Sequence, residues 1–264
     1  MKRLFVVLGV LAIVAFMPAD RAAADNNDHD LRAVPAVFVG TAPGCAPTPP
    51  GSRIVTAAWL NGMGLPDNDG ANNNTTAEQR GDRRSGLLLS KNGLTTDCSS
   101  AGAEIKGVRD MTVTATFELG FDYRNGGHCS GGSPRFNVTA RSASGETFHF
   151  VGGCGNDQSP TPAPQDPAQW TRVRFQTSNP AESFPVIPVG SKIVSIELIV
   201  DEGTDSVSTQ DPMGVGLSVV DNIFVNGEFI RSGSNNNKRH TFGKGKGDKE
   251  KDKDNDDEDE NDDD

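Results

Sequence analysis

The sequence is poor in the residues from which most active sites are built. Its 264 residues include four histidines, four cysteines, two tryptophans and one tyrosine. It contains no CxxC pair, GxSxG elbow, P-loop or dinucleotide-binding glycine pattern, which argues against zinc sites, serine hydrolases and nucleotide-binding enzymes. No window carries a helical apolar stripe, and 30 glycines and 16 prolines disfavour long helices. We therefore expect a protein that is not an enzyme and has little helix.

Long apolar runs are also absent, except at the start of the chain. Lys2 and Arg3 precede an apolar run from Leu4 to Met17, and Ala22–Ala24 supply small residues at a cleavage position. This order predicts a secretory signal peptide over residues 1–24. The run is shorter than the ~20 residues of a membrane-spanning helix. We expect a secreted protein, extracellular or periplasmic, with no transmembrane segment after cleavage.

Acidic residues gather at the other end of the chain. Residues 244–264 hold twelve acids and five lysines, which is −7 of the formal net charge of −11. Residues 232–264 contain one phenylalanine and no other large apolar residue, so we predict a disordered acidic tail. The negative charge also disfavours a nucleic-acid partner.

Residues 51–231 consist of strand-length runs separated by glycine, proline, asparagine and aspartate. The runs cover residues 53–60, 85–90, 103–108, 111–124, 135–142, 146–152, 171–177, 192–202 and 216–230. Several alternate apolar and polar residues, which is typical of antiparallel sheets with one dry face. We predict an all-β fold, a single antiparallel β-sandwich of the jelly-roll-like type over residues 51–231. Residues 25–50 are predicted to form an N-terminal linker or arm.

The four cysteines are an even number in an exported chain, which favours disulfides. Three pairings are open. A turn at Ser142–Gly145 folds residues 135–141 back on residues 146–151, and this hairpin brings Cys129 and Cys154 to the same open end. We predict a Cys129–Cys154 bond, which leaves Cys45–Cys98 as the second.

Within this hairpin, alternation also predicts which side chains share a face. Phe136, Val138 and Ala140 share one face of the first strand, and Phe148 and Phe150 share one face of the second. His149 points away from these two rings, and we expect it to be an exposed strand residue.

Few aromatic side chains can offer a ring face to a ligand. Trp59 is flanked by alanine and leucine and is expected in the core. Trp170 opens a strand after the proline-rich loop 155–169, and Tyr123 lies between two charged residues. Trp170 and Tyr123 are therefore the candidate ligand-binding residues, and the alternative is a core role for both.

Carboxylate and amide side chains cluster in the polar loop of residues 61–84. Asp67, Asp69 and Asn72 supply the hard oxygen ligands that Ca²⁺ prefers. They are candidate calcium ligands, although the loop lacks the spacing of an EF-hand. The alternative is a solvated turn.

The run LSVVDNIFVNG at residues 217–227 resembles the closing strand of jelly-roll carbohydrate-binding modules. Residues 133–138, with their flanking cysteines, look like a group of secreted bacterial proteins with no assigned activity. The modules imply glycan binding on a sheet face or at loop tips, often with a structural calcium ion. This chain departs from them because it has few of the Trp and Tyr rings that form sugar platforms.

We expect a secreted, non-catalytic binding module for an extracellular glycan or a cell-surface polymer. The alternative is a structural or interaction protein of the extracellular matrix or envelope, without a small-molecule ligand. Exposure of Trp170 and Tyr123 on one concave surface favours the first, and their burial favours the second.

Overall fold

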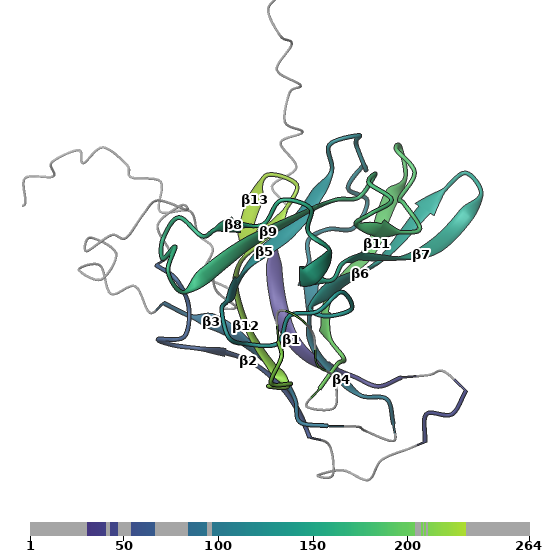
Figure 1. The fold of residues 1–264 in the computed structure, drawn as a ribbon. Coiled ribbons are helices and arrows are strands. Elements are labelled where there is room, and N and C mark those ends of the chain that lie inside the picture. The colour runs from purple at the N-terminus through teal and green to yellow at the C-terminus, as the bar shows by residue number, and fades with distance from the viewer. Residues whose placement is uncertain are drawn as a thin grey trace, which may run out of the picture.

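The fold is a sandwich of two antiparallel β-sheets (Figure 1). The computed structural model describes residues 31–40, 43–46, 54–66, 84–93, 97–203, 207, 209 and 211–230. Within these ranges there is no α-helix, and only residues Cys154–Asn156 form a short 3-10 turn. No helix in this part of the chain is long and apolar enough to cross a membrane. The predicted all-β sandwich is confirmed, whereas the predicted signal peptide and acidic tail lie outside the described residues.

The first sheet has six strands in the order β1-β4-β11-β6-β7-β10. In that order their bounds are Arg32–Phe38, Ser100–Lys106, Lys192–Val200, Arg135–Ser142, Gly145–Gly152 and Ser183–Phe184. The second sheet has seven strands in the order β2-β3-β12-β5-β9-β8, with β13 paired to β12. Their bounds are Val55–Leu60, Gly86–Lys91, Leu217–Val225, Glu118–Arg124, Trp170–Gln176, Thr161–Pro162 and Glu228–Ile230.

The main core lies between the two sheets, as the alternating sequence predicts. Phe121 and Phe175 from the seven-stranded sheet meet Phe136 from the six-stranded sheet. The Phe121 ring centroid is 5.8 Å from that of Phe136 and 6.0 Å from that of Phe175. All three side chains are fully buried. Inward-facing residues of both sheets thus build one hydrophobic core.

The first sheet begins earlier in the chain than expected. Residues 25–50 are predicted as a linker, yet Arg32–Phe38 forms β1 and pairs with β4 along its whole length. The Pro35 in this strand cannot donate a ladder hydrogen bond, and β1 is an edge strand, where proline is tolerated. The sandwich therefore starts before residue 51.

Residues 111–117, predicted to be the first half of one long strand, are irregular. Only Thr112 forms an isolated bridge there, to Lys192. Val113 and Phe117 are nevertheless fully buried. The alternation of apolar residues in this segment therefore indicates buried side chains and not a paired strand.

The predicted hairpin is present, but the burial of its second strand is opposite to our expectation. Strands β6 and β7 pair from Arg135↔Gly152 to Ser142↔Gly145. This register places His149 opposite Val138 on the core side, where His149 is 1% exposed. Phe148 and Phe150 face outward instead. The prediction that His149 is exposed is wrong, because its ring bonds Thr147 Oγ1 at 2.7 Å and the Pro185 carbonyl at 2.8 Å.

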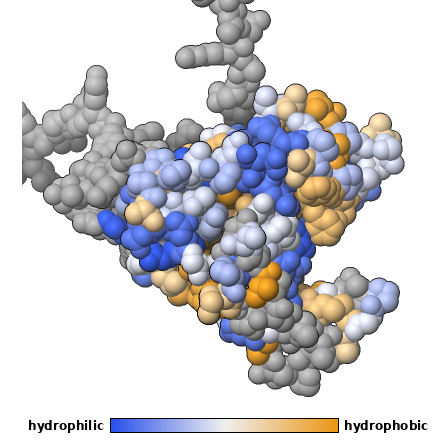
Figure 2. All heavy atoms as spheres, in the orientation of Figure 1, coloured by the Kyte–Doolittle hydropathy of each residue, from blue (hydrophilic) through white to orange (hydrophobic). Residues whose placement is uncertain are grey.

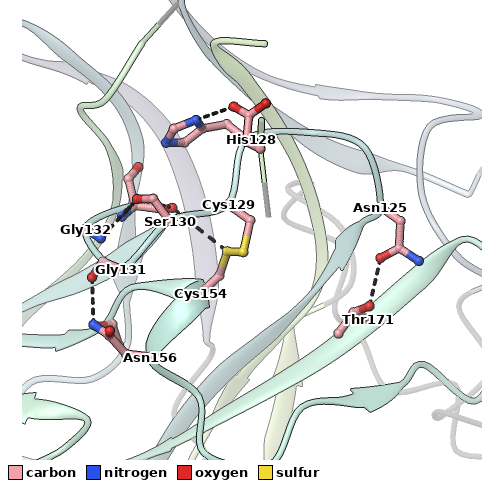
Figure 3. The surroundings of a disulfide bond; sticks show 12 residues. Asn125, His128, Cys129, Ser130, Gly131, Gly132, Cys154, Asn156 and Thr171 are labelled. Carbon is pink, nitrogen blue, oxygen red and sulfur yellow. Dashed lines mark hydrogen bonds and ion pairs between the residues drawn. A yellow bond between two sulfur atoms is a disulfide. The ribbon is translucent and has the colours of Figure 1, made fainter. Parts of the chain in front are cut away.

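Both predicted disulfides are confirmed. Cys45 bonds Cys98, and Cys129 bonds Cys154 at the open end of the β6–β7 hairpin, with 5.5 Å between the latter two Cα atoms. Figure 3 shows the second bond, with the Asn156 amide donating to the Gly131 carbonyl at 2.6 Å beside it. This disulfide therefore holds the loop before β6 against the turn after β7.

Candidate functional site

The structure does not bring the two predicted ligand-binding residues together. In the pairing of β5 with β9, Tyr123 lies opposite Thr171, and Arg124 lies opposite Trp170. Successive side chains of a strand point to opposite faces, so Tyr123 and Trp170 lie on opposite faces of the seven-stranded sheet. Tyr123 packs against the main core, where burial raises the pKa of its hydroxyl. A shared aromatic platform at this pair is therefore ruled out by geometry.

Trp170 belongs to a small second core on the outer face of the seven-stranded sheet. It is 2% exposed and packs with Leu65, Ala163 and Val219. The Trp170 ring lies against the outer face of the sheet and is covered by the segments that carry Leu65 and Ala163. The Trp170 ring consequently offers no open stacking face for a sugar.

The predicted calcium ligands Asp67, Asp69 and Asn72 lie outside the described residues. Among the residues that the structure does place, no group of three or more His, Cys, Asp or Glu side chains could hold a metal ion. Calcium therefore stays an expectation from the sequence.

A buried charge cluster occupies the outer face of the seven-stranded sheet. Asp122 is fully buried and accepts two hydrogen bonds from Arg172, at 2.8 and 2.9 Å, and one from Asn222 at 2.9 Å. The Arg174 guanidinium lies 3.6 Å from the same carboxylate and 4.6 Å from the Phe224 ring centroid. Burial lowers the pKa of Arg174 to about 10, so it stays charged at neutral pH. Because Arg172 and Asn222 bond the buried Asp122 carboxylate and Arg174 lies beside it, we assign the cluster to stability.

A second polar network surrounds His128 beside the Cys129–Cys154 bond (Figure 3). The His128 ring is fully buried, with Nδ1 2.7 Å from Asp211 Oδ2 and Nε2 3.0 Å from Glu202 Oε2. The Ser130 hydroxyl donates to the same Glu202 carboxylate. These contacts tie the loop after β5 to two points of the connection from β11 to β12, Glu202 and Asp211.

The carboxylates of Glu202 and Asp211 favour the charged form of His128. Burial lowers the pKa of His128, but the hydrogen bonds and charges of Glu202 and Asp211 outweigh it and leave the pKa raised. In return, the hydrogen bond from His128 lowers the pKa of Glu202. The network is a buried ion-paired clamp between segments distant in sequence.

The outer face of the six-stranded sheet carries an exposed group of aromatic rings. Phe148, Phe150 and Phe184, which we call the phenylalanine patch, are 48%, 42% and 43% exposed. Phe148 and Phe150 lie two residues apart on β7, with ring centroids 5.0 Å apart in an edge-to-face arrangement. Phe184 of β10 is the cross-strand partner of Phe150. Figure 2 shows apolar residues gathered at the right of the view, on the side where Figure 1 labels β7.

Polar groups adjoin the patch on the same face. Arg135 of β6 lies over the Phe150 ring, with its guanidinium carbon 4.8 Å from the centroid. Arg135 is itself fixed by two hydrogen bonds to Asp201, at 2.7 and 2.6 Å. Asn137 is the cross-strand partner of Phe150. The exposed rings thus have a charged and an amide group at their border.

The strand registers extend this border into a row across the whole sheet. Neighbouring strands place one residue each in the row, which reads Val34, Glu104, Glu197, Asn137, Phe150 and Phe184. Burial and the nearby charge of Glu104 raise the pKa of Glu197. Two glutamates and an asparagine lie in the middle of the row and two phenylalanines at one end, so the face offers ring surfaces and hydrogen-bonding groups side by side.

The sequence contained one signal for this patch that our prediction did not use. The Phe-His-Phe triplet at residues 148–150 must bury either the histidine or the two rings. We expected the histidine outside, because phenylalanine is usually buried. The carbonyl of Pro185, distant in sequence, provides the hydrogen bond that makes a buried His149 acceptable.

Comparison of the chain with protein-family models, with curated proteins and with solved structures gives no match. The candidate site therefore rests on the geometry of this molecule alone.

Proposed function

We propose that this protein is a secreted, non-catalytic binding module that holds a polysaccharide chain on the outer face of the six-stranded sheet. The observation that carries the proposal is the phenylalanine patch, three half-exposed rings on adjacent strands of one face. Contiguous apolar surface of this kind on a folded domain marks an interaction site.

The chemistry of the border favours a sugar over a purely apolar partner. A pyranose ring has an apolar face that packs on an aromatic ring and a rim of hydroxyl groups that needs donors and acceptors. Asn137 and Glu197 offer such groups beside the rings. Arg135, whose nitrogens bond Asn137, Gly132 and Asp201, holds the Asn137 side chain in place. A chain lying along the row would meet Phe184 and Phe150 first and then Asn137 and Glu197.

The alternative is a structural or interaction protein whose patch docks on another protein. The burial of Trp170 and the inward position of Tyr123 support it, because neither serves as a sugar platform. The polar row favours the glycan, and binding tests separate the two.

We expect the purified protein to bind at least one flat, extended glycan in a panel of β-1,4-linked gluco-, xylo- and chito-oligosaccharides, assayed with and without Ca²⁺. The double variant Phe148→Ala/Phe150→Ala should weaken that binding about tenfold or more, because central aromatic contacts dominate such interfaces. Affinity electrophoresis and titration calorimetry measure the loss.

Met213→Ala is the matched control, because Met213 is an apolar side chain that is 83% exposed on a different segment. It should bind as the parent protein does. No binding across the panel, or equal binding by the double variant, contradicts the proposal. Self-association or protein capture lost in the double variant would then support the alternative.

A further inference from the structure

Asn137 occupies a central place in the row that crosses the six-stranded sheet. Its cross-strand partner on one side is Phe150 of β7, and its partner on the other side is Glu197 of β11. Asn137 and Glu197 are half-buried on the outer face, whereas the residues before and after each of them are buried. A glycan that lies on the phenylalanine patch and extends along the row therefore reaches this amide and this carboxylate.

Arg135 sets the orientation of the Asn137 amide. Arg135 Nε donates a hydrogen bond to Asn137 Oδ1 at 3.1 Å. A guanidinium can only donate, so the atom that it bonds is the amide oxygen. The two N–H bonds of Asn137 Nδ2 remain, and they have no partner within the part of the chain that the structure describes. Because Asp201 holds the guanidinium in turn, Asn137 is fixed as a hydrogen-bond donor to a ligand.

Glu197 is the acceptor beside this donor. The other carboxylate of the row, Glu104, bonds Lys106, whereas Glu197 has neither a hydrogen bond nor an ion pair with any residue that the structure places. Burial and the charge of Glu104 raise the pKa of Glu197, because both disfavour its charged form. A carboxylate in these surroundings is stabilised by any N–H donor that a ligand brings.

A donor and an acceptor on neighbouring strands match a secondary amide. Directly opposed side chains of an antiparallel pair have Cβ atoms about 5 Å apart. In a trans amide the N–H and the C=O point in opposite directions. An amide between the two side chains therefore turns its oxygen to Asn137 and its N–H to Glu197. A hydroxyl group would have to make both bonds through a single oxygen atom.

We propose that the row selects glycans that carry 2-acetamido groups, the N-acetylhexosamine class. The acetamido oxygen accepts from Asn137 Nδ2, the acetamido N–H donates to Glu197, and the sugar ring packs on Phe150. Asn137 and Glu197 determine the specificity, and Arg135 is a positioning residue. This inference rests on the proposed glycan-binding function and names the sugar class that the face prefers.

Titration calorimetry of the full chain with three β-1,4-linked oligosaccharides of equal length tests this selection. Their repeating units are N-acetylglucosamine, glucosamine and glucose, which share the ring and the linkage and differ at the 2-position. We expect the N-acetylglucosamine oligomer to bind about tenfold more tightly than either of the others, since it alone makes both amide hydrogen bonds. Equal binding of the three, or tighter binding of another, overturns acetamido selection without affecting the proposed function. Binding of none overturns both.

Asn137→Asp keeps the shape of the side chain and replaces its N–H donors with an acceptor. It should bind the N-acetylglucosamine and glucose oligomers about equally, and so should Glu197→Ala. Glu104→Ala is the matched control, because it removes a carboxylate from the next strand of the row and should keep the preference. Retained binding of the glucose oligomer shows that each variant is folded. A preference that persists in Asn137→Asp and Glu197→Ala overturns the assignment.

A second readout uses the parent protein and does not depend on the folding of a variant. In ¹⁵N-labelled protein, the side-chain amide signals of Asn137 should shift further on saturation with the N-acetylglucosamine oligomer than with the glucose oligomer. The Asn156 side-chain amide, which bonds the Gly131 carbonyl, is the internal reference and should not move. Equal shifts of the Asn137 signals with the two oligomers, or no shift with either, would contradict a hydrogen bond from Asn137 to the acetamido group.

Discussion

An Asp122→Ala variant is expected to lose roughly 3–5 kcal/mol in the free energy of unfolding, the usual cost of removing one partner from a buried ion pair. Asp122 is fully buried, and the side chains of Arg172 and Arg174 are 19% and 18% exposed. Without the carboxylate, two neighbouring guanidinium groups would share a poorly hydrated site, and the Asn222 amide would lose its acceptor. Urea unfolding at neutral pH measures the loss.

Glu146→Ala is the matched control for this variant. Glu146 also pairs with an arginine, Arg141, at 3.9 Å, but these side chains are 53% and 48% exposed. Exposed pairs contribute little, so the change should stay within about 1 kcal/mol. Equal losses in the two variants would contradict the stabilising role of the Asp122 cluster. Asp122→Asn, which keeps the shape but not the charge, should fall between the parent and Asp122→Ala.

A His128→Leu variant is expected to lose roughly 3 kcal/mol at pH 6, because it removes a charged hydrogen-bond partner from the buried Asp211 carboxylate. The pH dependence gives a sharper test. The pKa of His128 is raised in the folded state, so its contribution is fully present below the ordinary histidine pKa of 6.5 and is lost as pH rises through the raised value. Glu202 acts in the opposite direction. Its pKa is lowered, so its contribution is present above 4.5 and is lost as pH falls through the lowered value.

Between pH 4.5 and 6.5 both contributions are complete, and the clamp should stabilise the parent protein most in this window. The free energy of unfolding, measured across pH 4–9, should fall in the parent protein as the pH rises above 6.5. The fall should be smaller in His128→Leu. His149→Gln serves as the comparison. His149 is also buried, but its ring bonds a hydroxyl and a carbonyl rather than two carboxylates, and the decline should persist in that variant. Parallel profiles for the parent and His128→Leu would refute an ion-paired clamp.

The sequence predicted the sheets well because strand pairing follows local alternation. Val194–Val200 and Thr171–Gln176 showed the pattern clearly, and they lie within β11 and β9. The disulfide pairing followed from one hairpin turn, which fixes what its two ends meet. Strand β1 was missed because Ala and Pro give weak strand signals and its pairing partner, β4, lies 62 to 74 residues away in the registered pairs.

The candidate sites were less predictable because they depend on contacts between distant segments. Alternation divides Phe148, His149 and Phe150 into two faces but does not say which face meets the core. That choice needs Val138 opposite His149 and a carbonyl from Pro185. Similarly, the sequence made Trp170 a candidate ligand-binding residue. Its burial depends on Leu65, which comes from a loop over 100 residues earlier.

The most direct test of glycan binding is an NMR titration of protein labelled with ¹³C in its phenylalanine rings, using the oligosaccharides of the panel. The proposal predicts progressive, saturable shifts of the Phe148, Phe150 and Phe184 ring signals, assigned by single substitution, with the buried rings of Phe121 and Phe136 unmoved as internal references. Shifts confined to other residues, or none at any oligosaccharide concentration, would contradict a glycan-binding face on the six-stranded sheet.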